Sequence, residues 1–258
     1  YIIHMKYLFV LSSYSDYRQK IFDDIISPRN KQYCDIHGYK YVEIRKEHNP
    51  KPFRGNYTWN KFSIPLDLIN SGVLKEGDIL IHYDADILNV KPEISLEIPE
   101  DKSFGYSIDS GNTVCMGFWS MRVNDWSRQL IRNVMDENRW NRLKDEITIH
   151  DRFKTFSSYA QEFREQAMIH KLFGVKRHSD KSYWEYPDYG WHSDVTDECV
   201  YSLDELRDNV HVFPTEYNVT EWKGESSLQF NINPIDDKDD VILRHFTGCS
   251  WENIKSWV

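Results

Sequence analysis

Short apolar runs without helical spacing divide the first part of the chain and predict three buried strands. They are Lys6–Leu11, the β-branched stretch Tyr39–Arg45 and the run Gly77–Tyr83. Each run is too short for a helix of ordinary length and lacks the spacing of an amphipathic one. We therefore expect three strands in about the first ninety residues.

Between these runs, apolar residues recur at helical intervals. The first helical stretch extends to about Gly38 and is interrupted near Pro28. The second, which Gly72 ends, carries an apolar stripe at positions i, i+3, i+7 and i+10, namely Trp59, Phe62, Leu66 and Ile69. This alternation of strand and helix indicates a doubly wound α/β fold.

The chain continues with the same two kinds of element. The runs Phe104–Ile108 and Val114–Met121 predict further strands, and a helix follows the N-cap candidate Asn124. We expect another helix over Glu162–Phe173, and then loops and short strands that form the wall of a pocket.

A last short strand, Val241–Leu243, is expected to lead to His245. No repeat and no linker interrupts the sequence, so we expect one domain over residues 1–258. The predicted architecture is a mixed, mostly parallel central sheet flanked by helices.

Composition and charge narrow the classes of partner. The chain has 258 residues, is 40% hydrophobic and carries a net charge of −9, which argues against nucleic acid as a ligand. No apolar run is long enough for a membrane helix and no signal peptide is visible, so we expect a cytoplasmic protein without an integral membrane segment, the alternative being a luminal fragment of a membrane-anchored enzyme. The four cysteines have neither metal-ligand nor redox spacing, and we interpret them as reduced thiols.

Two acidic residues follow the third predicted strand, in the sequence Asp84-Ala85-Asp86. If the strand period of two continues, both carboxylates project from one face, at the edge of the sheet where ligands bind in open α/β folds. Carboxylates this close stay ionised together only when a cation or strong donors compensate them. Oxygen ligands of this kind suit Mg²⁺ or Mn²⁺. The alternative is a strand-end turn with two solvated acids.

Five ordered segments together resemble the GT-A type of nucleotide-sugar-dependent glycosyltransferase, and most of all its retaining galactosyl-, mannosyl- and xylosyltransferases. The resemblance spans nearly the whole chain. Asp84-Ala85-Asp86 is similar to the metal-binding DxD motif of that family. The other segments are Asn30–Tyr41, Trp59-Asn60-Lys61, Glu165-Gln166-Ala167 and His245-Phe246-Thr247-Gly248.

The resemblance implies a divalent metal and a nucleotide-diphosphate sugar as donor, with a UDP-sugar favoured. It assigns Asp86 to the metal, Asp84 to the metal or the ribose, and His245 as the third protein ligand. An imidazole ligand is unusual for Mg²⁺, so His245 favours Mn²⁺. The alternative for His245 is an ordinary core or surface histidine.

Donor contacts are implied at both ends of the chain. Ser12 and Tyr14 would lie near the base and ribose, Lys61 near the phosphates or the sugar, and Asn112 near the sugar. Relatives often place a lysine three residues after the last glycine of the His-Phe-x-Gly motif, where this chain has a tryptophan. Lys255 is then the candidate for holding the diphosphate, and Arg244 is an alternative.

Glu165 and Gln166 are the catalytic candidates that the resemblance implies. In a retaining enzyme they would stabilise an oxocarbenium-like species, whereas in an inverting enzyme Glu165 would act as general base. The aromatic and acidic segment Tyr186–Asp194 suits a carbohydrate acceptor, because rings stack on sugars and carboxylates accept from hydroxyls.

Two other functions remain open from the sequence. A haloacid-dehalogenase-like phosphatase also uses Asp-x-Asp after a strand, and Asp84 would then be its nucleophile. A non-catalytic sugar-binding protein that keeps the fold is the second. The resemblance favours a glycosyltransferase acting on a glycan or another hydroxyl acceptor.

Overall fold

A computed structural model describes residues 4–12, 17–45, 53–108, 114–144, 164–174, 199–220, 240–246, 254–255 and 257. At its centre is a six-stranded sheet with the order β2-β1-β3-β6-β5-β7. The strands are β1 (Lys6–Ser12), β2 (Lys40–Arg45), β3 (Ile79–Tyr83), β5 (Phe104–Ile108), β6 (Val114–Arg122) and β7 (Val210–Phe213).

The sheet is mixed and mostly parallel, as predicted. β1 pairs in parallel with both β2 and β3, and β5 pairs in parallel with β7. Only β6 runs the other way, antiparallel to β3 and β5. The β-α-β-α-β order predicted for the first part of the chain is therefore confirmed.

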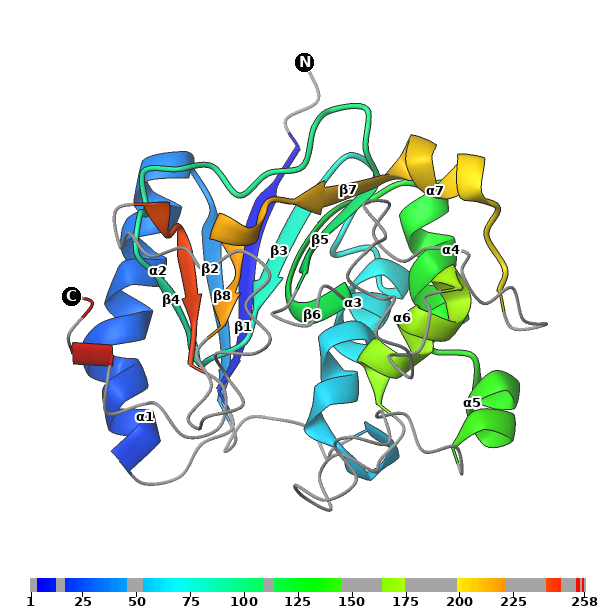
Figure 1. Cartoon of the computed structure of the whole chain (residues 1–258), viewed down its shortest axis with the longest axis horizontal. Helices are drawn as coiled ribbons and strands as arrows, with labels where there is room; N and C mark the ends of the chain where they lie inside the picture. Colours follow the sequence, from blue (N-terminus) through cyan, green and yellow to red (C-terminus); the bar gives the residue numbers. More distant parts are fainter. Residues whose placement is uncertain are drawn as a thin grey trace, which may run out of the picture.

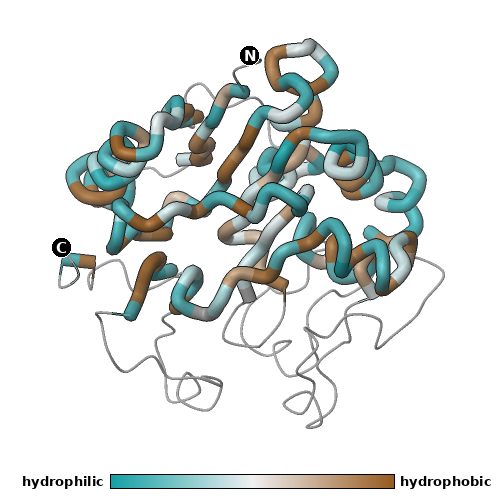
Figure 2. Tube along the Cα trace, turned by 90° about the horizontal axis from the view of Figure 1, so that it is seen from above, coloured by the Kyte–Doolittle hydropathy of each residue, from teal (hydrophilic) through white to brown (hydrophobic). Residues whose placement is uncertain are grey.

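Helices cover both faces of this sheet (Figure 1). On one face lie α1 (Tyr17–Ile21) and α2 (Ser27–His37), which pack on the apolar cluster that contains Leu8 and Ile81. On the other face lie α3 (Asn60–Asn70), α4 (Asp125–Val134) and α6 (Glu165–Phe173), which share a second apolar cluster around Trp119. Hydrophilic and hydrophobic residues are interspersed along the described chain on both sides of the molecule (Figure 2). Two shorter helices are α5 (Glu137–Leu143) and α7 (Leu203–Asn209).

The interruption predicted near Pro28 has an unexpected form. The chain stays helical from α1 to α2, through a π-helical turn over Phe22–Ile26 that directly precedes α2. Proline lacks an N–H and its ring collides with the carbonyl four residues earlier, which the wider π turn accommodates. Gly38 then ends α2 in the left-handed conformation, with φ of 71°.

A small second sheet lies beside the first, in the order β4-β9-β8. It joins β4 (Ile87–Asn89), β8 (Val219–Thr220) and β9 (Leu243–His245). The last strand begins two residues later than predicted, so His245 belongs to the strand and does not follow it. Neither β4 nor α5 was predicted, and α7 and β7 lie in a region where loops and short strands were expected.

Two further expectations can be compared with the described residues. Cys34, Cys115 and Cys199 are free thiols, as predicted, and the first two are buried. None of the described helices combines the length and the apolar character that crossing a bilayer requires.

Candidate metal centre

Asp84 and Asp86 lie in the turn between β3 and β4. The expectation that they project from one face of a strand is wrong, because β3 ends at Tyr83. The Asp84 N–H donates to the Gly117 carbonyl at 2.7 Å, and the Ile87 N–H donates to the Asp84 carbonyl at 2.9 Å. This backbone pairing closes the turn and brings the two carboxylates together.

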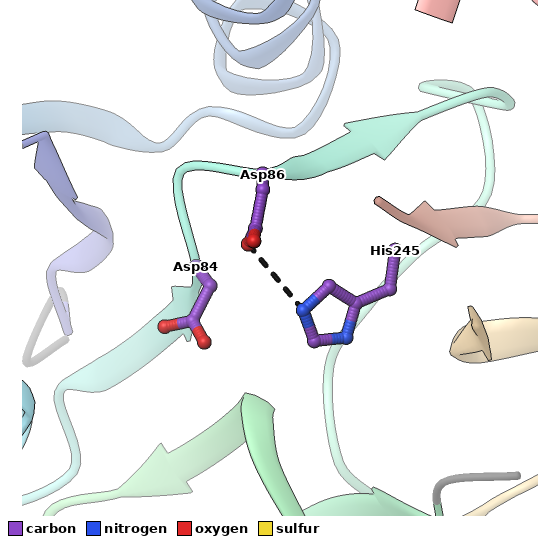
Figure 3. Close-up of side chains that lie close together, drawn as sticks. All are labelled: Asp84, Asp86 and His245. Atoms are coloured by element: carbon purple, nitrogen blue, oxygen red, sulfur yellow. Dashed lines mark ion pairs between the residues drawn. The ribbon is translucent and has the colours of Figure 1, made fainter. Parts of the chain in front are cut away.

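His245 completes the group from the far end of the sequence (Figure 3). β9 pairs antiparallel with β4, and His245 stands opposite Ile87. One ligand atom from each of Asp84, Asp86 and His245 lies within 4.8 Å of the others, so a single ion could contact all three. The His245 Nε2 is 3.3 Å from the Asp86 Oδ1.

The chemistry of this group fits a divalent cation. The Asp86 Oδ1 is buried and, among the described residues, has no partner with hydrogen-bond geometry, although the His245 ring is close to it. A buried carboxylate oxygen in that state is costly unless a cation neutralises it. Two carboxylates and an imidazole suit Mn²⁺ better than Mg²⁺.

Without a metal ion, the charges within the group favour a protonated His245. Burial opposes the charged ring, but the Asp86 carboxylate beside it outweighs burial and raises the pKa of His245 well above its ordinary value. The ring Nδ1 faces the Asn218 Oδ1 at 3.1 Å. The protein alone therefore holds a proton where a metal ion would bind.

Lys61 links the metal centre to the catalytic candidate Glu165. Its Nζ is 2.8 Å from the Asp84 Oδ1 and 3.2 Å from the Glu165 Oε1. Burial opposes the charge, but the Asp84 and Glu165 carboxylates together raise the pKa of Lys61. Asp84 responds in the opposite direction, because Lys61 more than offsets its burial and lowers the pKa of Asp84.

Arg54 anchors the start of α3, the helix that carries Lys61. Its guanidinium lies over the Trp59 and Trp140 rings, at 4.5 and 4.8 Å from their centroids. Its Nη2 also donates to the Met135 carbonyl at 2.9 Å. These contacts tie the turn before α3 to the end of α4, so the position of Lys61 depends on residues outside the site.

Glu165 and Gln166 are the first two residues of α6, at the point where this helix meets β6. The Gln166 Oε1 accepts from the Met116 N–H at 3.1 Å, and this backbone donor fixes the orientation of the amide. The Glu165 side chain is 4% exposed, and its Oε2 has no hydrogen-bond partner among the described residues. Glu165 is thus buried at the site beside the partly exposed Gln166, with one carboxylate oxygen left for a ligand.

A break in the pairing of β6 supplies the backbone groups that the site uses. Tyr106 of β5 stands opposite Trp119, but the next residue, Ser107, stands opposite Cys115, so Met116–Phe118 are passed over. Within that segment, the Met116 carbonyl accepts from Lys61 at 3.4 Å and the Gly117 carbonyl accepts from Asp84. The irregular segment therefore contacts α3, α6 and the metal-binding turn.

His82 was not predicted as part of the site. It is fully buried on β3 behind Asp84, with its Nε2 3.4 Å from the Asp84 Oδ1 and its Nδ1 2.9 Å from the Phe9 carbonyl. Burial lowers the pKa of His82, although Asp84 favours the charged ring. The sequence shows His82 only as a single histidine in an apolar strand, and such a histidine does not indicate a contact with the site.

Of the other residues predicted to contact the donor, the structure describes Ser12 and Lys255. Ser12 ends β1 and is fully buried, and its hydroxyl donates to the Gln19 Oε1 at 2.7 Å. Lys255 is exposed beside the buried Ile254. Both assignments remain predictions. Tyr14, Asn112 and the acceptor segment Tyr186–Asp194 lie outside the described residues.

Arg244, the alternative for holding the diphosphate, is placed unfavourably. It precedes His245 on β9, and neighbouring strand residues point to opposite faces. Its guanidinium lies over the Trp257 ring, 4.6 Å from the centroid. The face of β9 that presents His245 to Asp86 is therefore not the face that Arg244 occupies.

Comparisons with known proteins give similarity at the level of structure. No family model matches the sequence, and no curated protein matches it. A crystal structure of a glycosyltransferase involved in the glycosylation of the major capsid of PBCV-1 is 12% identical, covers 97% of this chain and 98% of that chain, and has a TM-score of 0.47. The catalytic domain of Drosophila β1,4-galactosyltransferase 7 in complex with xylobiose is 16% identical, covers 51% of this chain and 52% of that chain, and has a TM-score of 0.35.

A mutant of the same Drosophila enzyme, in complex with manganese, UDP-Gal and xylobiose, matches with the same identity and coverage and a TM-score of 0.31. All three of these structures are of glycosyltransferases. At such low identities and TM-scores, function has to be argued from the residues of the site.

Proposed function

We propose that this chain is a metal-dependent glycosyltransferase that moves a sugar from a nucleotide-diphosphate sugar to a hydroxyl group of a glycan or another acceptor. One observation carries the proposal. Ligand atoms of Asp84, Asp86 and His245, from distant parts of the sequence, lie within 4.8 Å of one another, and the buried Asp86 Oδ1 has no hydrogen-bond partner among the described residues. Such a group fits Mn²⁺, and UDP-sugars are the donors that the motifs favour.

The protein's own groups would bind the donor and orient it. Asp84, Asp86 and His245 would hold the ion, which, when bound, neutralises charge on the leaving diphosphate. Lys61 adds a buried positive charge beside Asp84. Because the chain as a whole is strongly acidic, a polyanionic donor depends on such local positive charge.

The surroundings of Glu165 favour retention over inversion. Its Oε1 already accepts from the Lys61 ammonium, so only Oε2 is left to face a ligand, and the carboxylate is held in place rather than free to follow the proton of an acceptor hydroxyl. A fixed negative charge beside the anomeric carbon would instead stabilise an oxocarbenium-like species. Gln166, whose oxygen is bound to the Met116 N–H, presents its amide nitrogen as a donor to the sugar or its acceptor.

A calorimetric donor screen tests the proposal. UDP, GDP and their sugars are titrated with and without Mn²⁺ into the wild type and Asp86→Ala. We expect metal-dependent binding of one nucleotide, which Asp86→Ala abolishes. Absence of binding by every nucleotide diphosphate in the presence of Mn²⁺ would contradict the proposal, and trapping of a phosphoaspartate at Asp84 would support a phosphatase instead. The anomeric configuration of the product, read by NMR, tests retention.

A further inference from the structure

The orientation of the His245 ring decides whether it can bind a metal ion. A neutral imidazole carries one proton on two nitrogens, so Nε2 can act as a ligand only when the proton is on Nδ1. In the structure Nε2 faces Asp86, and Nδ1 faces the Asn218 Oδ1 at 3.1 Å. Whatever group stands at Nδ1 therefore selects the tautomer.

Asn218 is built into the fold at this point. It is 3% exposed and immediately precedes β8, the strand that pairs in parallel with β9 and places Thr220 opposite His245. A buried asparagine can accept through its oxygen or donate through its nitrogen, and the two choices have opposite effects. If the Asn218 oxygen accepts from Nδ1–H, the His245 Nε2 is unprotonated and can bind a metal ion. If the Asn218 nitrogen donates to Nδ1, the proton of a neutral ring is on Nε2, which then cannot bind the ion.

Gly117 limits the ring from another side. A Cβ built on this glycine would lie 2.8 Å from the His245 Cε1 and 3.2 Å from its Nδ1, which is too close for a side chain. The Cys115 Sγ lies on the same side, 3.3 Å from that Cβ position. The imidazole therefore packs directly against the β6 backbone, with Asn218 and Asp86 at its two nitrogens.

We propose that Asn218 is a positioning residue for the metal centre, and that its Oδ1 accepts the Nδ1–H of His245 so that the Nε2 lone pair faces Asp84 and Asp86. This inference rests on the metal centre of the proposed function and not on the identity of the sugar or its acceptor. Groups that orient a metal-binding histidine in this way commonly change metal affinity by about 10–100-fold when they are removed.

Mn²⁺ titrations without nucleotide test the role of Asn218. Asn218→Leu should weaken Mn²⁺ binding about 10–100-fold, whereas Asn218→Asp, which can only accept a hydrogen bond, should keep wild-type affinity or bind more tightly. Asn209→Leu is the matched control, because Asn209 is also hydrogen-bonded, to Ser103, but directly precedes β7, whereas Asn218 follows the other end of that strand. Its Mn²⁺ affinity should be that of the wild type.

The outcomes separate this inference from the proposed function. The positioning role is overturned if Asn218→Leu binds Mn²⁺ with wild-type affinity, or if the Leu and Asp variants lose equal affinity. Loss of Mn²⁺ binding in Asp86→Ala would in either case still support the metal centre. Wild-type affinity in Asp86→Ala would overturn the metal centre itself. If Asn218→Leu does not fold, long-range ¹H–¹⁵N spectra of the wild type saturated with Zn²⁺, a diamagnetic ion that accepts imidazole ligands, decide, because a proton on Nε2 of His245 in the metal-bound protein contradicts the inference.

Discussion

Replacing Lys61 with methionine removes the positive charge that lies between the Asp84 and Glu165 carboxylates. Methionine keeps much of the volume but leaves Asp84 and Glu165 without the ammonium that both contact. The Lys61 and Glu165 side chains are 8% and 4% exposed, and that of Asp84 is 27% exposed. The charges left behind are therefore largely shielded from water.

The magnitude follows from these distances. With an effective dielectric constant of about 20, contacts of 2.8 and 3.2 Å correspond to gross attractions of about 6 and 5 kcal/mol. Desolvation of the three groups offsets much of this, and removing one partner of a buried pair costs about 3–5 kcal/mol. Because Asp84 is partly exposed, we expect Lys61→Met to lower the free energy of unfolding by about 3 kcal/mol at pH 7 without metal.

The loss should depend on pH in a definite direction. Lys61 lowers the pKa of Asp84 in the folded state, so their interaction stabilises the fold above the unfolded-state pKa of about 4 and is lost as the pH falls. The difference between wild type and Lys61→Met should accordingly be largest near neutral pH and shrink below about pH 4. Added Mn²⁺ should restore part of the stability, since it supplies positive charge beside Asp84.

Urea denaturation followed by circular dichroism measures these differences. Lys6→Met is the matched control, because Lys6 is paired with Glu97 at 2.6 Å but the two side chains are 35% and 25% exposed. Such an exposed pair contributes less than about 1 kcal/mol. A loss in Lys61→Met no larger than in this control, or one that does not change with pH, would refute the reasoning.

Three further outcomes are expected. The affinity for Mn²⁺ should fall about tenfold per pH unit below the raised pKa of His245, because the ring must lose its proton to bind the ion, and calorimetry at several pH values checks this. Gln166→Leu should lower the rate of transfer about 100-fold while Mn²⁺ binding stays unchanged, and an unaltered rate contradicts its role. Asn124→Ala should cost about 1 kcal/mol in urea denaturation, because it removes the capping box with Ser127 that begins α4, and should leave metal binding intact.

Local signals in the sequence predicted most of the central sheet and its helices. The cap at Asn124 and the apolar stripe from Trp59 to Ile69 are each contained in one segment, and the structure has α4 and α3 where they indicate. A local signal was also available for α7, whose first turn follows the cap Ser202 and contains Glu205, but the aromatic composition of that region obscured it. No such signal exists for β4, which has three residues and is a strand only because β9 pairs with it.

The candidate site could be predicted as a set of residues but not as an arrangement. Lys61 and Glu165 were each predicted, yet their contact depends on α3 and α6 packing on the same face of the sheet. Gly117 lies inside an apolar strand, where an isolated glycine indicates a bulge or a close approach of backbone, and the structure shows both. Asn218 belongs to Pro214–Asn218, which resembles a Pro-x-x-Tyr-Asn segment of the same family, but this resemblance does not predict its contact with His245, which requires β8 and β9 to be paired.

The pairing of β4 with β9 also determines when the site can form. Asp84 and Asp86 leave the ribosome long before His245, and at typical rates of synthesis the interval between them is roughly 10–30 s. Lys61 precedes Asp84 in the sequence, so its ammonium can contact that carboxylate throughout this interval, and Glu165 joins them about halfway through it. The first strands can therefore form with the Lys61 ammonium beside Asp84. The third metal ligand, His245, becomes available only after β9 has been synthesised and has paired with β4.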